Sequence, residues 1–172
     1  MPALSIEFCR RGACLPQLGL WLDPSQAVRG PERVFVSHAH SDHTARHREV
    51  ILTEATARLM KARIGGRRLE HVLPFGEPRR FEGDPVPFQI TLLPAGHILG
   101  SAMALIEAEG ESLLYTGDFK LRHSLSAGLC EPRPADVLVM ETTFGRPQYR
   151  FPPDDAVWSE LIRGLPPADL PP

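Results

Sequence analysis

The sequence predicts an α/β fold whose reactive side chains lie on loops at one edge of a sheet. Short apolar segments rich in β-branched residues recur along the chain and are typical of buried strands, as in residues 33–36. Only the segments 54–64 and 154–163 have the apolar spacing and the end signals of helices. Histidine and acidic residues directly follow several strand segments, which places them on the loops that leave the sheet.

We expect the first half of the chain to form mainly strands. Alternation of apolar and polar residues predicts a strand at 4–9, and apolar runs predict strands at 18–22, 33–36 and 50–53. Residues 44–47 are expected to form a first helical turn. Thr53 is expected to cap the helix 54–64, which the two glycines at 65–66 end. The residues that give this helix an apolar side are Ala57, Leu59, Met60 and Ile64.

The second half repeats this pattern. Strands are expected at 86–93, 102–108 and 112–115, and Gly110 joins the last two as a hairpin. Another apolar strand is expected at 135–140. The helix 154–163 follows two prolines, and its apolar residues are Val157, Trp158, Leu161 and Ile162.

Length and composition restrict the class of protein. The 172 residues suffice for one domain with a real core, and no window approaches the ~18 apolar residues of a membrane span. The N-terminus lacks the pattern of a signal peptide, so we expect no membrane association. A net charge of −2 argues against a passive, high-affinity nucleic-acid binder, but not against an enzyme that contacts phosphates through metals and local arginines. Three cysteines without CxxC spacing indicate reduced thiols in a cytoplasmic protein.

Three histidines and one aspartate are concentrated between positions 38 and 43. Residues two apart in an extended chain face the same side, so His38 and His40 can direct both imidazoles at one point. Once the chain turns, Asp42 and His43 can direct their side chains at a neighbouring point. Imidazole suits zinc and carboxylate oxygen is also accepted, so the pattern predicts a dinuclear metal site. A lone histidine is more often a surface or core residue, but neither setting explains four such side chains together.

Two further ligand candidates lie at the ends of expected strands. His97 follows Gly96 in a glycine-flanked loop, and Asp118 follows the apolar segment 113–115 and Gly117. Each alone is a weak signal, because a loop histidine or aspartate after glycine is common. With the first cluster they complete a coordination set, in which Asp118 could bridge two metals with its two oxygens.

A dinuclear metal site is suited to a particular reaction, the hydrolysis of phosphodiesters. Two metals about 3.5–4 Å apart stabilise the attacking and leaving oxygens of phosphodiester hydrolysis, and they lower the pKa of water. Asp42 is acidic and close enough to orient that water. A nucleophilic serine or cysteine mechanism has no support, because the sequence contains no GxSxG elbow and no recognisable Cys–His pattern.

Residues 38–43, His-Ala-His-Ser-Asp-His, resemble the HxHxDH motif of the metallo-β-lactamase fold superfamily. Residues 95–97 and 116–118 resemble its third and fourth motifs, in the right order. Residues 94–101 and 115–120 resemble the β-CASP branch of nucleic-acid-processing nucleases, and residues 141–145, Glu-Thr-Thr-Phe-Gly, resemble the motif A of that branch. Within the branch, the sequence is similar to bacterial exonucleases associated with DNA ligase and to RNA 3′-end-processing factors. The similarity extends from about position 18 to 163.

The resemblance implies a metallo-β-lactamase-like αββα sandwich and two zinc ions. The implied ligands of one zinc are His38, His40, His97 and Asp118. The implied ligands of the other are Asp42, His43 and Asp118. Glu141 would not bind metal but would orient an active-site histidine through a hydrogen bond. Asp23 is a second candidate for such a role and is equally well explained as a strand-ending residue before Pro24.

The sequence departs from the family pattern after Glu141. A β-CASP enzyme continues into a cap domain and then supplies motifs B and C and a further ligand histidine, whereas no histidine follows His123 here. We therefore expect residues 1–150 to form a partial metallo-β-lactamase-like domain without the cap or the C-terminal half. Residues 151–172 are expected to form a helix and a Pro-rich tail at the start of the missing β-CASP region. A truncated gene product is the favoured explanation, and a split enzyme or a degenerate module stays open.

The expected function is zinc-dependent hydrolysis of nucleic-acid phosphodiesters, exonucleolytic at the 3′ ends of DNA or RNA. The alternative is a non-catalytic, metal-bound interaction module, which docks onto a DNA ligase, a helicase, a complementary chain or a second copy. The missing histidines favour this alternative for the 172 residues taken alone. A small-molecule hydrolase acting on thioesters or lactams is a third hypothesis, against which residues 141–145 argue.

Overall fold

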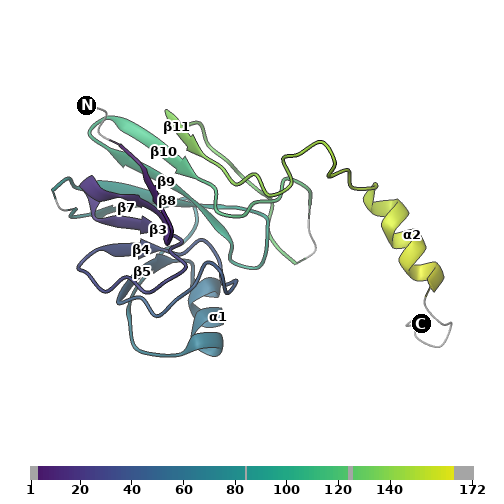
Figure 1. The fold of residues 1–172 in the computed structure, drawn as a ribbon, viewed down its shortest axis with the longest axis horizontal. Coiled ribbons are helices and arrows are strands. Elements are labelled where there is room, and N and C mark those ends of the chain that lie inside the picture. The colour runs from purple at the N-terminus through teal and green to yellow at the C-terminus, as the bar shows by residue number, and fades with distance from the viewer. Residues whose placement is uncertain (1–3, 84, 124–125, 165–172) are drawn as a thin grey trace. The chain divides into compact units, whose positions relative to one another are not determined.

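The computed structural model describes residues 4–83, 85–123 and 126–164. The chain divides into two compact units, Met1–Glu141 and Thr142–Pro172, which are described separately. The first unit contains two β-sheets and the helix α1 (Figure 1). This arrangement confirms the α/β fold and is consistent with a metallo-β-lactamase-like sandwich.

The first sheet has six strands in sequence order. They are β1 Glu7–Cys9, β2 Gly12–Leu15, β3 Leu20–Leu22, β4 Arg33–Phe35, β5 Glu49–Leu52 and β6 Leu69–Val72. The strands β1 to β3 pair antiparallel, with the short 3₁₀ helix Pro16–Leu18 before β3, and β3 to β6 pair parallel. The carboxyl ends of the parallel strands therefore meet at one edge, as in other open parallel sheets.

The second sheet has five strands in the order β11-β10-β9-β8-β7. They are β7 Pro78–Phe81, β8 Phe88–Pro94, β9 Ala102–Ala108, β10 Glu111–Tyr115 and β11 Val137–Val139. All neighbours pair antiparallel except β10 and β11, which are parallel. The hairpin expected between β9 and β10 is confirmed.

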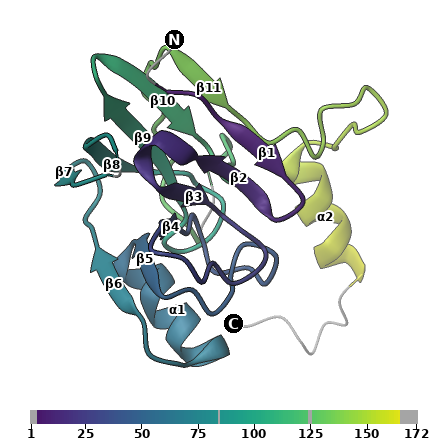
Figure 2. The same cartoon turned by 60° about the vertical axis from the view of Figure 1, so that its left-hand side comes forward.

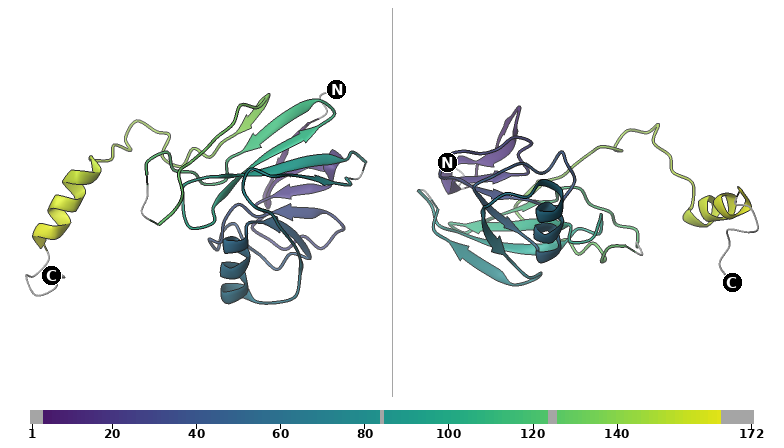
Figure 3. Two further views of the ribbon diagram at one scale, coloured as in Figure 1. Left: turned by 180° about the vertical axis from the view of Figure 1, so that it is seen from behind. Right: turned by 90° about the horizontal axis from the view of Figure 1, so that it is seen from below.

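The two sheets pack face to face around the main core (Figures 1 and 3). Alternate residues of the central strands point inward, as the period of a strand requires. The first sheet contributes Leu20, Leu22, Phe35 and Ile51, and the second contributes Ile90, Leu92, Ala104, Ile106 and Leu113. Each large apolar side chain buried here contributes about 1.5–3 kcal/mol to stability, so this core fixes the strand ends that carry the site.

Helix α1, Glu54–Ile64, packs on the outer face of the first sheet beside β5 and β6 (Figure 2). Ala57 and Met60 are buried against the outward residues of β4 and β5, and Leu59 and Ile64 pack at the rim of that cluster. The expected cap is confirmed, because the Thr53 hydroxyl accepts a hydrogen bond from the Thr56 N–H at 3.3 Å.

The structure corrects several local predictions. Residues 44–47 do not form a helical turn: the Thr44 hydroxyl donates to the His40 carbonyl, and the buried His47 side chain draws the segment toward Val28. The strands β2, β6 and β7 were not expected. Apolar runs are absent from β6 and β7, whose outer residues are largely exposed, so periodicity gave no signal there.

The second unit contains helix α2, Asp154–Gly164, which confirms the expected helix. Its residues Val157, Trp158, Leu161 and Ile162 are each about half exposed. The Pro-rich tail 165–172 lies outside the described residues. Among the helices of the described residues, neither α1 nor α2 is long and apolar enough to cross a membrane.

Candidate metal centre

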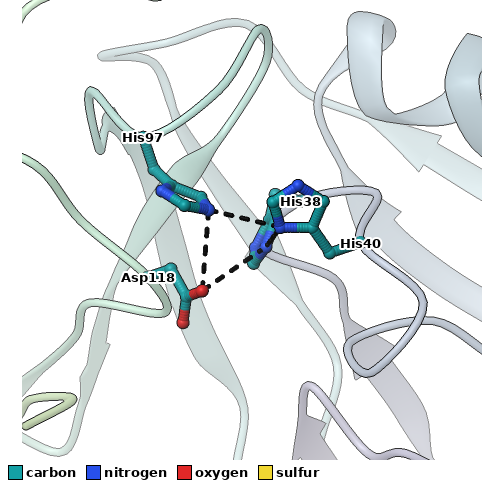
Figure 4. A group of neighbouring side chains, drawn as sticks. All are labelled: His38, His40, His97 and Asp118. Carbon is teal, nitrogen blue, oxygen red and sulfur yellow. Dashed lines mark hydrogen bonds and ion pairs between the residues drawn. The ribbon is translucent and has the colours of Figure 1, made fainter. Parts of the chain in front are cut away.

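Three imidazoles and one carboxylate converge where β4, β8 and β10 end (Figure 4). His38 and His40 follow β4, His97 follows β8, and Asp118 follows β10. One ligand atom from each of these four residues lies within 4.8 Å of all the others. The three segments that carry these residues therefore meet at one edge of the sandwich, and metal binding by them stays a prediction.

The nitrogens face one another at short range. His40 Nδ1 lies 2.9 Å from His38 Nε2 and 3.3 Å from His97 Nε2. Oδ2 of Asp118 lies 3.8 Å from His38 Nε2 and 3.6 Å from His97 Nε2. A single proton can form a hydrogen bond within only one pair of these nitrogens. A cation at the centre can instead bind the lone pairs of all three imidazoles and the carboxylate. The donor set of imidazole and carboxylate suits zinc.

The tautomer of His38 turns its free lone pair toward this centre. The Ser37 hydroxyl donates its one proton to Asp23 Oδ2 at 2.5 Å, so it accepts from His38 Nδ1 at 2.9 Å. Nε2 is then the unprotonated nitrogen of His38. Burial, together with His43, His97 and His40, lowers the pKa of His38 to about 3, so this imidazole is neutral at physiological pH. A neutral, oriented imidazole is the form that binds a metal.

A second group of ligand atoms adjoins the first through Asp118. His43 Nε2 lies 3.4 Å from Asp118 Oδ1 and 3.6 Å from Asp42 Oδ2. The two oxygens of Asp118 thus face different histidines, with Oδ2 toward His38 and His97 and Oδ1 toward His43. This division is what a carboxylate between two metal positions requires.

Asp23, at the carboxyl end of β3, supports both groups from behind. This buried carboxylate accepts hydrogen bonds from the Ser37 N–H at 2.7 Å and the Tyr115 hydroxyl at 3.1 Å, and it lies 3.0 Å from His43 Nδ1. Burial lowers the pKa of His43, but Asp23, with Asp118 and Asp42, more than offsets this and raises that pKa above its ordinary value. Burial and Asp23 raise the pKa of Tyr115, which keeps its hydroxyl a donor.

Two residues of this region have left-handed backbone conformations. Asp23 has a φ of 44°, which residues other than glycine seldom adopt and which is typical of functional sites. Gly117 has a φ of 52°, and a Cβ at this position would lie 2.6 Å from the Ser37 side chain. Glycine thus lets the strand end that carries Asp118 approach Ser37.

The loop that carries His97 is fixed by hydroxyl groups. The Ser101 hydroxyl accepts from the backbone N–H groups of His97 and Ile98 at 3.1 and 3.2 Å. The hydroxyls of Thr53 and Thr56 donate to the Gly100 carbonyl at 2.7 and 3.1 Å. The N-terminus of α1 therefore holds the far end of this loop. Burial lowers the pKa of His97, although the nearby acidic groups oppose that shift.

A family model described as the metallo-beta-lactamase superfamily matches residues 23–172. The chain belongs to the metallo-beta-lactamase superfamily. The matched region begins at Asp23 and includes every ligand candidate described above.

Three relatives indicate the branch of the superfamily that this chain resembles. The chain is 53% identical over 151 residues to "Probable DNA ligase" of Opitutus terrae, which is 87% of this chain and 14% of that protein. It is 30% identical over 152 residues to human "DNA cross-link repair 1A protein", and the match covers 83% of this chain and 14% of that protein. It is 45% identical over 60 residues to "Endoribonuclease YSH1" of Gibberella zeae, and the match covers 33% of this chain and 7% of that protein. The last two are β-CASP members, so the resemblance to that branch is confirmed. The chain spans about a seventh or less of the length of these three relatives.

Glu141, predicted to orient an active-site histidine, ends the first unit just after β11. Its N–H donates to the Thr116 hydroxyl at 3.3 Å. Burial lowers the pKa of His97, and the charges of Asp118 and then Glu141 oppose this shift without reversing it. The role of Glu141 in this superfamily member stays a prediction. The supports from Ser37, Tyr115, Thr53, Thr56 and Ser101 were not predicted, because single hydroxyl residues carry no spacing signal.

Proposed function

We propose that this chain carries the metal centre of a zinc-dependent phosphodiester hydrolase that acts on nucleic acid. The observation that supports it best is the division of the two Asp118 oxygens between His38 and His97 on one side and His43 on the other. Nucleic acid as substrate is supported by relatives named as a DNA ligase, a DNA cross-link repair protein and an endoribonuclease.

The proposed ligands fall into two sets. The first set is His38, His40, His97 and Asp118. The second set is Asp42, His43 and Asp118. When bound, zinc ions act as Lewis acids toward phosphate oxygens and lower the pKa of water.

The side chains around the ions have separate proposed roles. Ser37 fixes the tautomer of His38 through a hydrogen bond, and the Asp23 carboxylate lies 3.0 Å from Nδ1 of His43. Both contacts are proposed to keep one nitrogen of each ring turned into the site. Asp42 is exposed, so it reaches solvent and is proposed to orient the water that attacks phosphorus. Glu141 is proposed to act on His97 as an orienting residue.

The alternative is a non-catalytic, metal-bound module. In this case the centre binds metal but completes its second set only with a complementary chain or a second copy, or it serves as a module that docks onto a DNA ligase or a helicase. The proposed setting is the cytoplasm, which the free thiols of Cys9, Cys14 and Cys130 support.

Metal content and nuclease activity of the same sample test both functions. We expect about two zinc equivalents per chain and zinc-dependent cleavage of labelled DNA or RNA, with 3′ shortening for an exonuclease. The variant His40→Ala should lose both metal and cleavage, and His123→Ala, which changes an exposed histidine outside the site, should lose neither. Bound zinc without cleavage on any nucleic acid would reject the enzyme and leave the interaction module. An absence of bound zinc would reject both.

A further inference from the structure

Positive charge is concentrated in the segment 44–70, which follows the histidine cluster. This segment carries seven arginine and lysine residues and three glutamates, a net charge of +4, in a chain whose net charge is −2. Its seven cations are Arg46, Arg48, Arg58, Lys61, Arg63, Arg67 and Arg68. The remainder of the chain is therefore acidic, and the distribution of charge is strongly asymmetric.

The three glutamates of this segment leave its surface positive. Glu49 is buried. Glu54 Oε1 lies 2.5 Å from Arg58 Nη2 on the first turns of α1. Glu70, on β6, has its Oε1 2.8 Å from Nε of Arg68, the residue before that strand. The exposed cations that remain define a basic face, which consists of Arg46, Arg48, Lys61, Arg63 and Arg67.

Two contacts connect segments of the basic face to each other and to the metal centre. The Leu69 N–H donates to the Arg48 carbonyl at 2.9 Å, so the segment after the histidine cluster runs beside the end of the α1–β6 loop. Arg63, in the last turn of α1, donates from Nη1 to the Ala39 carbonyl at 2.8 Å. Ala39 stands between His38 and His40, so this edge of the face is one residue from two ligand candidates.

We propose that the basic face binds the phosphate backbone of a single nucleic-acid strand and guides it to the metal centre. The inference rests on the proposed function, because it names the surface that holds the substrate of that site. Arginine and lysine bind backbone phosphates without reading bases, and arginine does so through paired N–H donors. Solubility alone requires cations dispersed among anions, not an excess of one sign beside a metal site in a chain of the opposite net charge.

The chain offers a matched control for this face. Arg79 and Arg80 lie on the edge strand β7 of the second sheet, and Arg10 lies in the turn between β1 and β2. All three are exposed, as are Arg46, Lys61 and Arg67. Within the described part of the chain, the side chains of Arg46, Lys61 and Arg67 form no ion pair or hydrogen bond. Their replacement by glutamine therefore leaves the fold intact and changes charge alone.

Fluorescence anisotropy with a labelled single-stranded oligonucleotide measures binding to the zinc-loaded chain, and a nuclease-resistant phosphorothioate backbone prevents cleavage during the measurement. The face variant Arg46→Gln/Lys61→Gln/Arg67→Gln is compared with the control Arg10→Gln/Arg79→Gln/Arg80→Gln over a series of NaCl concentrations. The loss of three phosphate contacts should make the negative slope of log K against log salt concentration less steep by about 2. It should also weaken binding at low salt by about tenfold. The control should retain the slope and the affinity of the unaltered chain.

Two results would overturn the proposal: equal losses in both variants, which indicate a general effect of charge, or no loss in the face variant. Binding of the same variants to vesicles of anionic lipid is measured separately. If the face variant lost vesicle binding and kept oligonucleotide binding, the face would serve a membrane surface and the proposal would be wrong. Face-dependent binding by a chain that never cleaves would reject the enzyme while this proposal stands.

Discussion

Nδ1 of His43 lies 3.0 Å from Oδ2 of Asp23, a carboxylate buried at the end of β3. The same carboxylate accepts the Ser37 hydroxyl proton, and Ser37 in turn contacts Nδ1 of His38. One aspartate therefore controls the orientation of a histidine in each proposed ligand set, although it lies in neither set.

The variant Asp23→Asn tests this control. An amide cannot accept from all of these donors and carries no charge, so the hydrogen bond that orients Ser37 toward His38 and the ion pair with His43 are weakened. Loss of such an outer carboxylate typically lowers metal affinity about 10–100-fold. Competition with a chromogenic zinc chelator measures the affinity, and Asp136→Asn, at an exposed carboxylate that accepts from Ser112, is the control. An unchanged affinity in Asp23→Asn would show that the aspartate serves only the fold.

Gly100 offers a test of the loop that positions His97. The residue has a φ of 79°, and a Cβ there would lie 2.6 Å from the Ala55 Cβ and 3.0 Å from the Thr53 hydroxyl. Gly100→Ala should therefore displace the loop from α1, lower the free energy of unfolding by about 1–3 kcal/mol and weaken zinc binding.

The matched variant is Gly110→Ala, in the hairpin turn between β9 and β10. Its φ of 84° is similar, but a Cβ there meets nothing within 4 Å. It should lose some stability through the backbone alone and keep its zinc affinity. Equal zinc affinities in the two alanine variants would refute the role of the Gly100 contact.

Zinc removal should lower stability, because an ion that binds only the folded state stabilises it. At a free zinc concentration about 100 times the Kd, the gain is about 2.7 kcal/mol, which raises Tm by about 5–10 °C in a chain of this size. Differential scanning calorimetry with and without EDTA measures this shift. His38→Gln should melt at one temperature in both conditions, and a zinc-dependent shift that survives in this variant would place the ion elsewhere.

His47 should make stability depend on pH between about 4 and 6.5. Burial lowers the pKa of His47 to about 4, whereas the unfolded chain keeps its ordinary value near 6.5. The unfolded state therefore binds more protons in this window, so stability falls as pH falls, by about 3 kcal/mol at most. Urea unfolding of the zinc-loaded chain at several pH values measures the decline, which should be smaller in His47→Gln.

Glu49 provides a second pH window for comparison. Burial raises its pKa, but hydrogen bonds from His71 and Arg33 outweigh this and lower the pKa below its ordinary 4.5. Its contribution is therefore present above pH 4.5 and is lost only at more acidic pH. If His47→Gln kept the full decline above pH 4.5, His47 would not be its source.

The sequence predicted the elements whose periodicity is strong. The helix 54–64 and the strand 102–108 have the predicted bounds, because α1 has a clear cap and β9 is a long apolar run. The strands β6 and β7 escaped prediction, since pairing with neighbours rather than their own apolar content makes them strands.

The residues proposed as ligands were singled out by the sequence, whereas the residues that support them were not. Four of the six ligand candidates lie between positions 38 and 43, and the structure brings all six close to Asp118. Their role as ligands stays a prediction. Asp23 was a candidate with an equally good structural explanation. The contacts of its carboxylate with Ser37 and Tyr115 join three separate strands, and no local pattern reveals such a junction.

Anomalous X-ray scattering at the zinc edge, from crystals grown with zinc, would locate the bound ions. We expect a strong peak about 2.0–2.2 Å from Nε2 of His38 and His97, Nδ1 of His40 and one oxygen of Asp118. A second peak should lie beside His43 and the other Asp118 oxygen. Zinc found only at exposed residues such as His123, with the three imidazoles bonded to one another or to water, would rule out a metal centre at these residues.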